Sequence, residues 1–247
     1  MNKKSIRSPY VIVLMLSYNG KKLLDEALSS YINNTYDNFK IILIDNGSTD
    51  STTSYVKVRF PNVEVITLNE NKGYSGGFNV GLDYAFNNEN ADYVLVTNND
   101  VKADLNLISE LVDTADSNDK VGFVIGKVYF YEKKQMLQSV GKKHDSIYWS
   151  AGHIGDREID TGQYDSNQER DWCDDIYWLV SSDLYSKTGG YDTEFRFQAE
   201  DYDWQVRAKK EGFKIFYNYK AKLWHKDSVT IGKNSAFKSY YDFRNPL

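Results

Sequence analysis

The chain has 247 residues, of which 41% are hydrophobic and 26% are charged, and its formal net charge is −5. These values are typical of one globular α/β domain, and the negative balance excludes a general electrostatic attraction to nucleic acid. An acidic chain that binds a phosphate ligand needs a metal ion, a helix N-terminus or local cations to do so.

The compartment is constrained by the cysteine count and by the N-terminus. Cys173 is the only cysteine, so an intramolecular disulfide is impossible, which fits a reducing, cytoplasmic location. No signal-peptide pattern follows the basic N-terminus, and the longest apolar run, at 10–16, is too short to span a bilayer. The sequence allows peripheral membrane contact and leaves the oligomeric state open.

Strand and helix patterns alternate along the first half. Continuous apolar runs predict strands buried on both faces of a sheet, and the segments between them have helical spacing. Repeated βα units of this kind imply a mainly parallel sheet with right-handed crossovers. The predicted order is strand 11–16, helix 21–33, strand 39–44, helix 50–58, strand 63–68, helix 75–87, strand 93–97, helix 105–115 and strand 121–130.

The pattern changes after residue 131. Residues 133–170 are polar, with scattered Gly and Asp, and indicate long loops with a hairpin. A strand at 172–180, a turn at Gly189-Gly190, a helix at 200–210 and short strands at 213–217 and 221–224 are expected to follow.

Four polar groups fall at the carboxyl ends of predicted parallel strands, which is where open sheets bind ligands. Any one of them is compatible with an ordinary turn, since Asn, Asp and Gly are common turn residues. Their recurrence at corresponding positions favours a binding site instead. The groups are Ser17-Tyr18-Asn19, Asp45-Asn46, the segment 69–77 and Asn98-Asn99-Asp100.

The segment before the third predicted helix has the features of a phosphate-binding loop. Its glycines let the backbone approach a ligand, its lysine adds a cation, and the helix N-terminus favours an anion. It matches neither the dinucleotide-binding fingerprint nor the P-loop. The residues are Asn71, Lys72, Gly73, Tyr74, Ser75, Gly76 and Gly77.

Three further positions carry groups suited to chemistry. Asp100 is a plausible Mg²⁺ ligand if diphosphate and water complete the shell. Glu200-Asp201 opens a helix, where the two carboxylates either complement the helix dipole or act as a general base and its supporting group. His225 is expected at a strand end, where it is either structural or a ligand of metal or diphosphate. Asp203 and Arg207 have the spacing of a helical ion pair.

Taken together, these segments resemble the inverting glycosyltransferase family 2, which has the GT-A fold, and the front half is most similar to the branch with many rhamnosyltransferases. The resemblance spans nearly the whole chain. The matching stretches are 13–19, 44–51, 69–79, 97–100, 189–192 and 200–208, together with His225, Tyr240-Tyr241 and Arg244-Asn245.

The resemblance implies roles for individual residues. Asp45 would contact the nucleotide base, in a pocket lined by Ser17 and Asn19, and Tyr18 is expected at the same nucleotide-sugar site. The stretch Asn98-Asn99-Asp100 stands where the family has its Asp-x-Asp metal motif, so Asp100 would be the principal ligand of Mg²⁺ or Mn²⁺. Asp201 would be the catalytic base supported by Glu200, and His225 would help to hold the metal or the diphosphate.

The reaction that the resemblance implies is one inverting transfer. A dTDP- or UDP-sugar would donate its sugar to a hydroxyl of a glycan or lipid-linked acceptor, in cell-surface polysaccharide synthesis at the inner face of a bacterial membrane. The family's processive members carry a Gln-x-x-Arg-Trp motif that this sequence lacks, which favours a single addition. The expected organisation is one GT-A domain over 1–247, with a nucleotide-sugar-binding half at about 9–130 and an acceptor-binding half at about 131–247.

Aromatic residues of the back half either stack on sugar faces or form ordinary core. These are Tyr148, Trp149, Trp172, Tyr177 and Trp178.

Two other functions stay open from the sequence. A sugar nucleotidyltransferase uses a related sheet, but it would need an Arg-bearing, Gly-rich loop after the first strand, where this chain has Ser17-Tyr18-Asn19-Gly20. A non-catalytic nucleotide-sugar-binding module is the second alternative, and the presence of Glu200-Asp201 argues against it.

Overall fold

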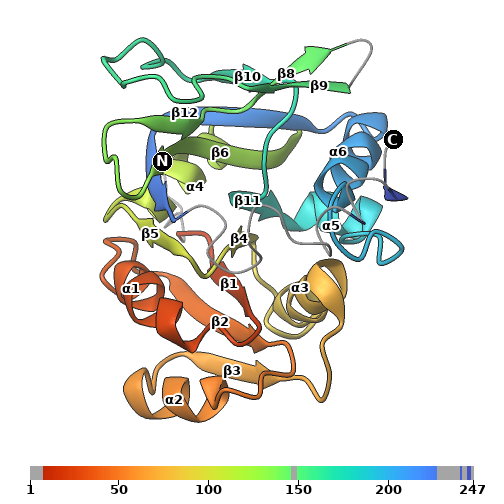
Figure 1. Ribbon diagram of the computed structural model, residues 1–247. Coiled ribbons are helices and arrows are strands. Elements are labelled where there is room, and N and C mark those ends of the chain that lie inside the picture. The colour runs from red at the N-terminus through yellow and green to blue at the C-terminus, as the bar shows by residue number, and fades with distance from the viewer. Residues whose placement is uncertain (1–7, 146–148, 227–239, 241–243, 246–247) are drawn as a thin grey trace, which may run out of the picture.

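A computed structural model describes residues 8–145, 149–226, 240, 244 and 245. In them, helices cover both faces of a central ten-stranded sheet, and a two-stranded hairpin lies at one end (Figure 1). The first 116 residues contribute β1 (Val11–Ser17), α1 (Lys21–Ile32), β2 (Phe39–Asp45), α2 (Thr52–Arg59), β3 (Glu64–Thr67), α3 (Gly73–Asp83), the π-helical turn η1 (Tyr84–Asn88), β4 (Tyr93–Thr97), β5 (Val101–Ala103) and α4 (Leu107–Asp116).

The rest of the chain extends the same sheet. The strand order is β10-β12-β6-β11-β4-β1-β2-β3, with β5 paired to β12 and β7 to β6, while β8 and β9 form the separate hairpin. The elements are β6 (Val121–Phe130), β7 (Leu137–Ser139), β8 (Lys142–Asp145), β9 (Trp149–His153), β10 (Gln168–Arg170), β11 (Tyr177–Ser181), α5 (Ser182–Thr188), α6 (Glu200–Lys210) and β12 (Lys214–His225).

Parallel pairing brings the carboxyl ends of the front strands to one edge. β1 lies between β2 and β4, with Ser17 opposite Asp45 and Met15 opposite Thr97. The polar residues that follow these strands therefore meet at a common edge, as the sequence predicts.

β11 brings the back half to the same edge. It runs antiparallel to β4 with Tyr177 opposite Thr97, so the residues before β11 lie beside those after β4. The Asn98 N–H donates a hydrogen bond to the Ile176 carbonyl at 3.1 Å. The connection into β11 is thus part of the ligand-facing edge.

Two apolar cores, one on each face of the sheet, explain the continuous apolar runs. Alternate residues of β1 point to opposite faces, with Val13 packing under α1 and α4 and Leu14 packing under α3. The helices α5 and α6 cover the second face through Leu184 and Trp204. In the described residues, no helix is long and apolar enough to cross a bilayer.

Three element predictions are wrong in their bounds. The strand expected at 172–180 begins only at Tyr177, because Asp175 and Ile176 form a turn. The two short strands expected at 213–217 and 221–224 are one strand, β12, whose register shifts between Asn218 and Lys222 against β6. The helix expected at 75–87 begins at Gly73 and its α-helical part ends at Asp83.

The segment 133–170 contains the predicted hairpin, formed by β8 and β9, and also the short strands β7 and β10. No strand was predicted for β5, β7 or β10, and no helix for α5.

Candidate active site

The loops after β1, β2 and β4 are tied to one another by side chains. The Asn99 amide donates to the Ser17 hydroxyl at 3.2 Å, and both side chains are buried. The Asn19 side-chain oxygen accepts from the Thr49 N–H at 2.8 Å. Tyr18, between them, is 42% exposed. The structure therefore places the Ser17-Tyr18-Asn19 group and Asn99 at one site.

Asp45 lies at the end of β2 with its carboxylate held in place. One oxygen accepts from the Ser48 N–H at 2.9 Å and the other accepts from the Thr53 hydroxyl. The residue is 2% exposed. Its orientation is fixed by the turn that follows the strand, and its contact with a base stays a prediction.

Asn46 organises the predicted phosphate-binding loop. Its side-chain oxygen accepts from the Lys72 N–H and its amide donates to the Gly73 carbonyl, both at 2.9 Å. The Asn71 side chain accepts from the Gly73 N–H at 2.8 Å. The loop ends where α3 begins, so the N-terminus of this helix lies at the site.

Two glycines predicted for the loop, Gly76 and Gly77, lie instead inside α3 and differ in what surrounds them. Gly77 is buried, and an added Cβ would lie 2.5 Å from the Leu16 side chain, so its small size lets α3 approach β1. Gly76 is partly exposed and would meet only Lys72 Cβ, at 3.0 Å.

Asp100 and His225 form a two-residue donor set. Asp100 Oδ1 lies 3.3 Å from His225 Nε2, and the two side chains are 8% and 9% exposed. Pairing of β5 with β12 places His225 opposite Val101, which explains why residues 125 positions apart meet. His225 Nδ1 lies 3.0 Å from Gln138 Oε1, which orients the ring.

This donor set fits a divalent ion that also takes ligands from its substrate. No group of three or more His, Cys, Asp or Glu suited to a metal gathers among the residues that the structure describes. Asp100 supplies the carboxylate oxygen that Mg²⁺ or Mn²⁺ takes and His225 a nitrogen donor, which leaves room for diphosphate oxygens and water.

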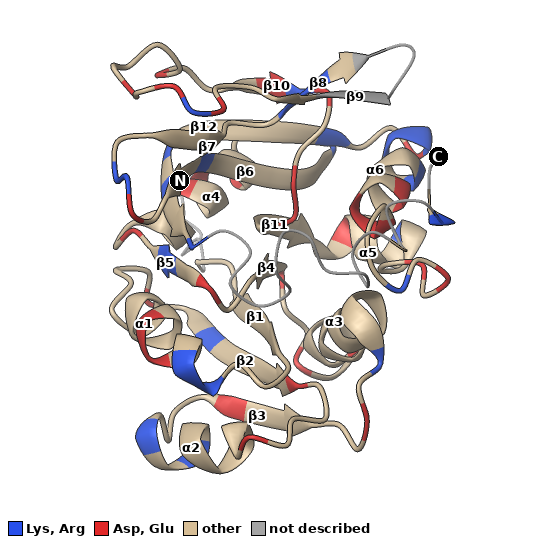
Figure 2. Cartoon of the chain, viewed as in Figure 1, with Lys and Arg blue, Asp and Glu red and all other residues tan. Residues whose placement is uncertain are grey.

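A second cluster gathers carboxylates around the start of α6. Figure 2 shows acidic residues in the first turn of α6 and in the connection into β11. Glu200 is buried, and its Oε2 has no hydrogen-bond partner. Asp175 accepts from the Tyr191 hydroxyl at 3.1 Å. Gln205 holds the helix to this connection, because its oxygen accepts from the Cys173 N–H at 2.8 Å.

These carboxyl groups hold protons more tightly than free ones. Burial, helped by the Asp201 carboxylate, raises the pKa of Asp175 to about 7. Burial, with Asp175 and Asp201 nearby, raises the pKa of Glu200 well above its ordinary value. Burial also raises the pKa of Asp201, although Lys142 opposes it. Perturbed carboxyls that face a ligand-binding edge are typical of acid–base sites.

Tyr74 joins the two clusters. Its hydroxyl lies 3.4 Å from Asn98 Oδ1 and 3.4 Å from the Asp175 carbonyl. Its N–H donates to the Arg196 carbonyl at 3.1 Å, four residues before α6. The loops after β1, β2 and β4 and the carboxylate cluster at the start of α6 therefore adjoin each other at one edge of the sheet.

Sequence reasoning missed four residues of this site: Asp174, Asp175, Lys142 and His153. The signal was present in Asp174-Asp175, which stand just before a strand, but their place at the edge follows only from the antiparallel direction of β11. Lys142 and His153 lie on the hairpin and reach Asp174 at 2.6 and 2.9 Å.

The aromatic residues mostly form core, one of the two alternatives left open by the sequence. Tyr177 and Trp178 are at most 1% exposed, and Trp172 packs under the ammonium of Lys209, 3.7 Å from its ring centroid. Tyr148 and Tyr241 lie outside the described residues, as does the side chain of Trp149.

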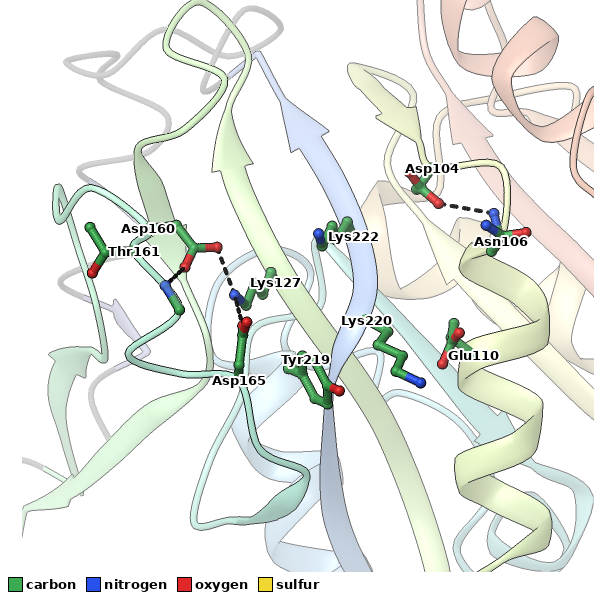
Figure 3. A pocket seen from close by; sticks show the side chains of 11 residues that line it. Asp104, Asn106, Glu110, Lys127, Asp160, Thr161, Asp165, Tyr219, Lys220 and Lys222 are labelled. Atoms are coloured by element: carbon green, nitrogen blue, oxygen red, sulfur yellow. Dashed lines mark hydrogen bonds and ion pairs between the residues drawn. The ribbon is translucent and has the colours of Figure 1, made fainter.

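A polar cleft of about 600 Å³ lies elsewhere, between α4, the loop around Asp160 and the bulge of β12 (Figure 3). None of the candidate site residues lines it. Its Lys127 is paired with Asp160 and Asp165 at 2.6 Å each. Its three lysines face four carboxylates, so it offers no net positive charge to a nucleotide diphosphate.

Comparison with known proteins identifies the family of the chain. The model of glycosyl transferase family 2 matches residues 12–166. An uncharacterized glycosyltransferase of Haemophilus influenzae is 38% identical over 77 residues, covering 30% of this chain and 24% of the relative. The N-acetylglucosaminyl-diphospho-decaprenol L-rhamnosyltransferase of Mycobacterium tuberculosis is 25% identical over 242 residues, covering 91% of this chain and 78% of the relative.

Two further similarities extend over most of the chain. The poly-beta-1,6-N-acetyl-D-glucosamine synthase of Staphylococcus aureus is 23% identical over 90% of this chain, which spans 51% of that protein. The structure of a mannosyltransferase from Pyrobaculum calidifontis superposes with a TM-score of 0.63 and 16% identity, over 95% of this chain and 60% of that one. The predicted GT-A fold is thereby confirmed, and the chain belongs to glycosyltransferase family 2.

Proposed function

We propose that this chain is an inverting glycosyltransferase. It transfers one sugar from a nucleotide-diphosphate sugar, expected to be a dTDP- or UDP-sugar, to a hydroxyl of a glycan or lipid-linked acceptor. The Mycobacterium relative is named for a lipid-linked acceptor and the Staphylococcus relative for a polysaccharide, which supports this acceptor class.

The observation that carries the proposal is the meeting of two predicted groups at one edge. The Asn98-Asn99-Asp100 stretch and the Glu200-Asp201 pair are about 100 residues apart in sequence, and Tyr74 contacts Asn98 as well as the connection beside the carboxylates. A pure binding module has no need for a buried, proton-holding carboxylate beside its ligand.

Each residue then has a defined task. The loop from Asn71 to Gly73 receives the diphosphate at the N-terminus of α3. Asp45 accepts a hydrogen bond from the base or the ribose. Asp201 takes the proton from the acceptor hydroxyl while that oxygen attacks the anomeric carbon from the face opposite the diphosphate. One displacement inverts the anomeric configuration, with no covalent glycosyl-enzyme.

Asp100 and His225 would hold a divalent ion, Mg²⁺ or Mn²⁺. Such an ion, when bound, supplies electrostatic stabilisation of the negative charge that develops on the diphosphate. The Pyrobaculum mannosyltransferase was solved with GDP-Man and Mn²⁺, which supports a divalent ion in this fold.

The first test is a panel of UDP-, dTDP- and GDP-sugars, each with and without Mn²⁺, read by thermal shift and by donor hydrolysis. Metal-dependent stabilisation by one nucleotide class, lost in Asp100→Asn, is the expected result. Absence of any response in a folded sample would contradict the proposal. Release of pyrophosphate from a nucleoside triphosphate and a sugar phosphate would identify a nucleotidyltransferase instead.

A further inference from the structure

A group of charges stands behind the carboxylates of α6, and Asp174 is at its centre. Lys142 and His153 are cross-strand neighbours of the β8–β9 hairpin. Lys142 Nζ lies 2.6 Å from Asp174 Oδ1, and His153 Nδ1 lies 2.9 Å from Asp174 Oδ2. The Ser139 hydroxyl donates to the same carboxylate at 3.0 Å. Asp174 is therefore a fully engaged carboxylate that anchors the hairpin.

Lys142 also faces the predicted base. Its Nζ lies 4.0 Å from Asp201 Oδ2 and 4.6 Å from the centroid of the Tyr202 ring. Its backbone N–H donates to the Trp172 carbonyl at 2.7 Å, which fixes the start of the side chain. The side chains of Lys142 and Asp201 are only 11% and 14% exposed, so little water screens them from each other.

We infer that Lys142 is a positioning residue, whose ammonium, held by Asp174, keeps the Asp201 carboxylate ionised and oriented for the acceptor hydroxyl. The inference rests on the proposed function, in which Asp201 accepts a proton. It assigns to the hairpin the task of delivering a fixed cation to the base.

The charges around Asp201 predict the direction in which its pKa changes when each of them is removed. Burial raises the pKa of Asp201, Lys142 is the largest influence that lowers it, and Asp174 raises it. Burial alone would lower the pKa of Lys142, but Asp174 and Asp201 outweigh it and raise that pKa well above its ordinary value. The titratable groups around the pair are Lys142 and His153 from the hairpin, Cys173, Asp174 and Asp175 from the connection into β11, Glu200 and Tyr202 from α6, Tyr74 from α3, and Tyr191.

Two substitutions must then act in opposite directions. Lys142→Met removes the cation, so the pKa of Asp201 rises, and the acid limb of the kcat/KM profile moves up by about one pH unit or more. Asp174→Asn removes a negative charge that raises the pKa of Asp201, so the acid limb moves down. Lys142→Arg keeps the cation and holds the limb near its original position.

The experiment combines this pH profile with a direct titration. The chain is labelled with ¹³C-carboxyl aspartate, and the Asp201 resonance is assigned by its loss in Asp201→Asn. Opposite shifts for Lys142→Met and Asp174→Asn, in both readouts, are the expected result. Shifts in the same direction, or none, in variants that stay folded would overturn the inference.

The two readouts separate this inference from the proposed function. A wild-type chain that turns over no nucleotide sugar would contradict the function, while the titration of Asp201 would still decide the role of Lys142. If Lys142→Met does not fold, the double variant Lys142→Met/Asp174→Asn, which removes the pair together, takes its place. Asp201 must then titrate at a higher pH than in Asp174→Asn alone, and equal titration in the two chains refutes the inference.

Discussion

At the scale of single residues, Asp175 links the site to the stability of the chain. Its pKa is about 7 in the folded state, against about 4 for an unfolded aspartate. Between these values the folded chain holds a proton that the unfolded chain has released, so this group makes stability fall as pH rises. Asp175→Asn removes that cost and keeps the acceptor for the Tyr191 hydroxyl.

We expect Asp175→Asn to match the wild type at low pH and to exceed it above pH 7 by on the order of 4 kcal/mol. Urea denaturation across the pH range measures the difference. The exposed Asp119→Asn is the matched control and should leave the profile unchanged. If the wild type became more stable than Asp175→Asn as the pH rises, the raised pKa of Asp175 would be contradicted.

Asn46 is a second residue for which a substitution can be predicted, because its one side chain makes hydrogen bonds to two backbone groups of the loop. It is 2% exposed, and it satisfies the Lys72 N–H and the Gly73 carbonyl. Asn46→Ala leaves both groups without this partner and should cost about 2 kcal/mol. Thermal denaturation and the affinity for the nucleotide identified in the donor panel provide the measurement.

Asn46→Asp is the comparison, because it keeps the acceptor for Lys72 and loses the donor to Gly73. Because a carboxylate oxygen would then face the Gly73 carbonyl and add a negative charge to the predicted phosphate-binding loop, we expect stability and nucleotide affinity no higher than in Asn46→Ala. Equal affinity in all three chains would show that the loop does not hold the donor.

Part of the site could be predicted from sequence, and the reason is local. Asp45 ends β2 and Asp100 comes three residues after β4, so in both cases a preceding apolar run marks the place at the edge. Asp174 and Asp175 precede a strand, and only the antiparallel pairing of β11 brings them there. Lys142 is placed by a hairpin whose pairing partner is set by tertiary contacts. The hydrophobic pattern of the sequence therefore does not indicate that Asp174, Asp175 and Lys142 lie near the site.

At the scale of elements, the pairing of β6 with β12 depends on a close backbone approach. An added Cβ at Gly126 would lie 2.1 Å from the Ala221 carbonyl oxygen, at the β12 bulge. Gly126→Ala must therefore displace β12 and should cost more than about 2 kcal/mol. Gly122→Ala on the same strand is the control, since its nearest contact is Phe213 Cβ at 3.0 Å.

Urea denaturation of the two variants tests this difference. Because β12 carries His225 at its end, Gly126→Ala should also weaken the metal-dependent thermal shift. Equal free energies of unfolding in the two variants would mean that the β12 bulge can shift away from residue 126 without loss of stability.

The same elements show which parts of the fold are readable from sequence. The strands β1, β2 and β4 are readable because each contains a run of consecutive buried apolar residues. Helix α5 has seven residues and one buried side chain, Leu184, so its pattern is too short to detect. β12 looked like two strands because Asn218-Tyr219-Lys220 resembles a turn, while in the structure the Asn218 amide donates to the Glu110 carbonyl and the Thr114 hydroxyl.

At the scale of the whole molecule, the predicted phosphate-binding loop and the segment before α6 are joined by direct contacts. The Arg196 guanidinium donates to the Asn71 carbonyl at 3.0 Å, and the Arg196 carbonyl accepts from the Tyr74 N–H at 3.1 Å. The Ser75 hydroxyl donates to the Phe195 carbonyl. Ordering of the loop by a nucleotide should therefore also order the segment that leads to Asp201.

Hydrogen exchange measures this coupling. The nucleotide that responds in the donor panel, added with Mn²⁺, should slow exchange at 71–75 and also at 193–199, while the loop at 157–165 remains unchanged. Arg196→Ala should keep the first protection and reduce the second, because it removes the guanidinium contact with Asn71 and leaves the backbone contact of Tyr74 and the hydroxyl contact of Ser75. Protection confined to 71–75 in the wild type would mean that the donor loop and the base-bearing helix respond independently. Loss of both protections in Arg196→Ala would mean instead that Arg196 supports donor binding itself.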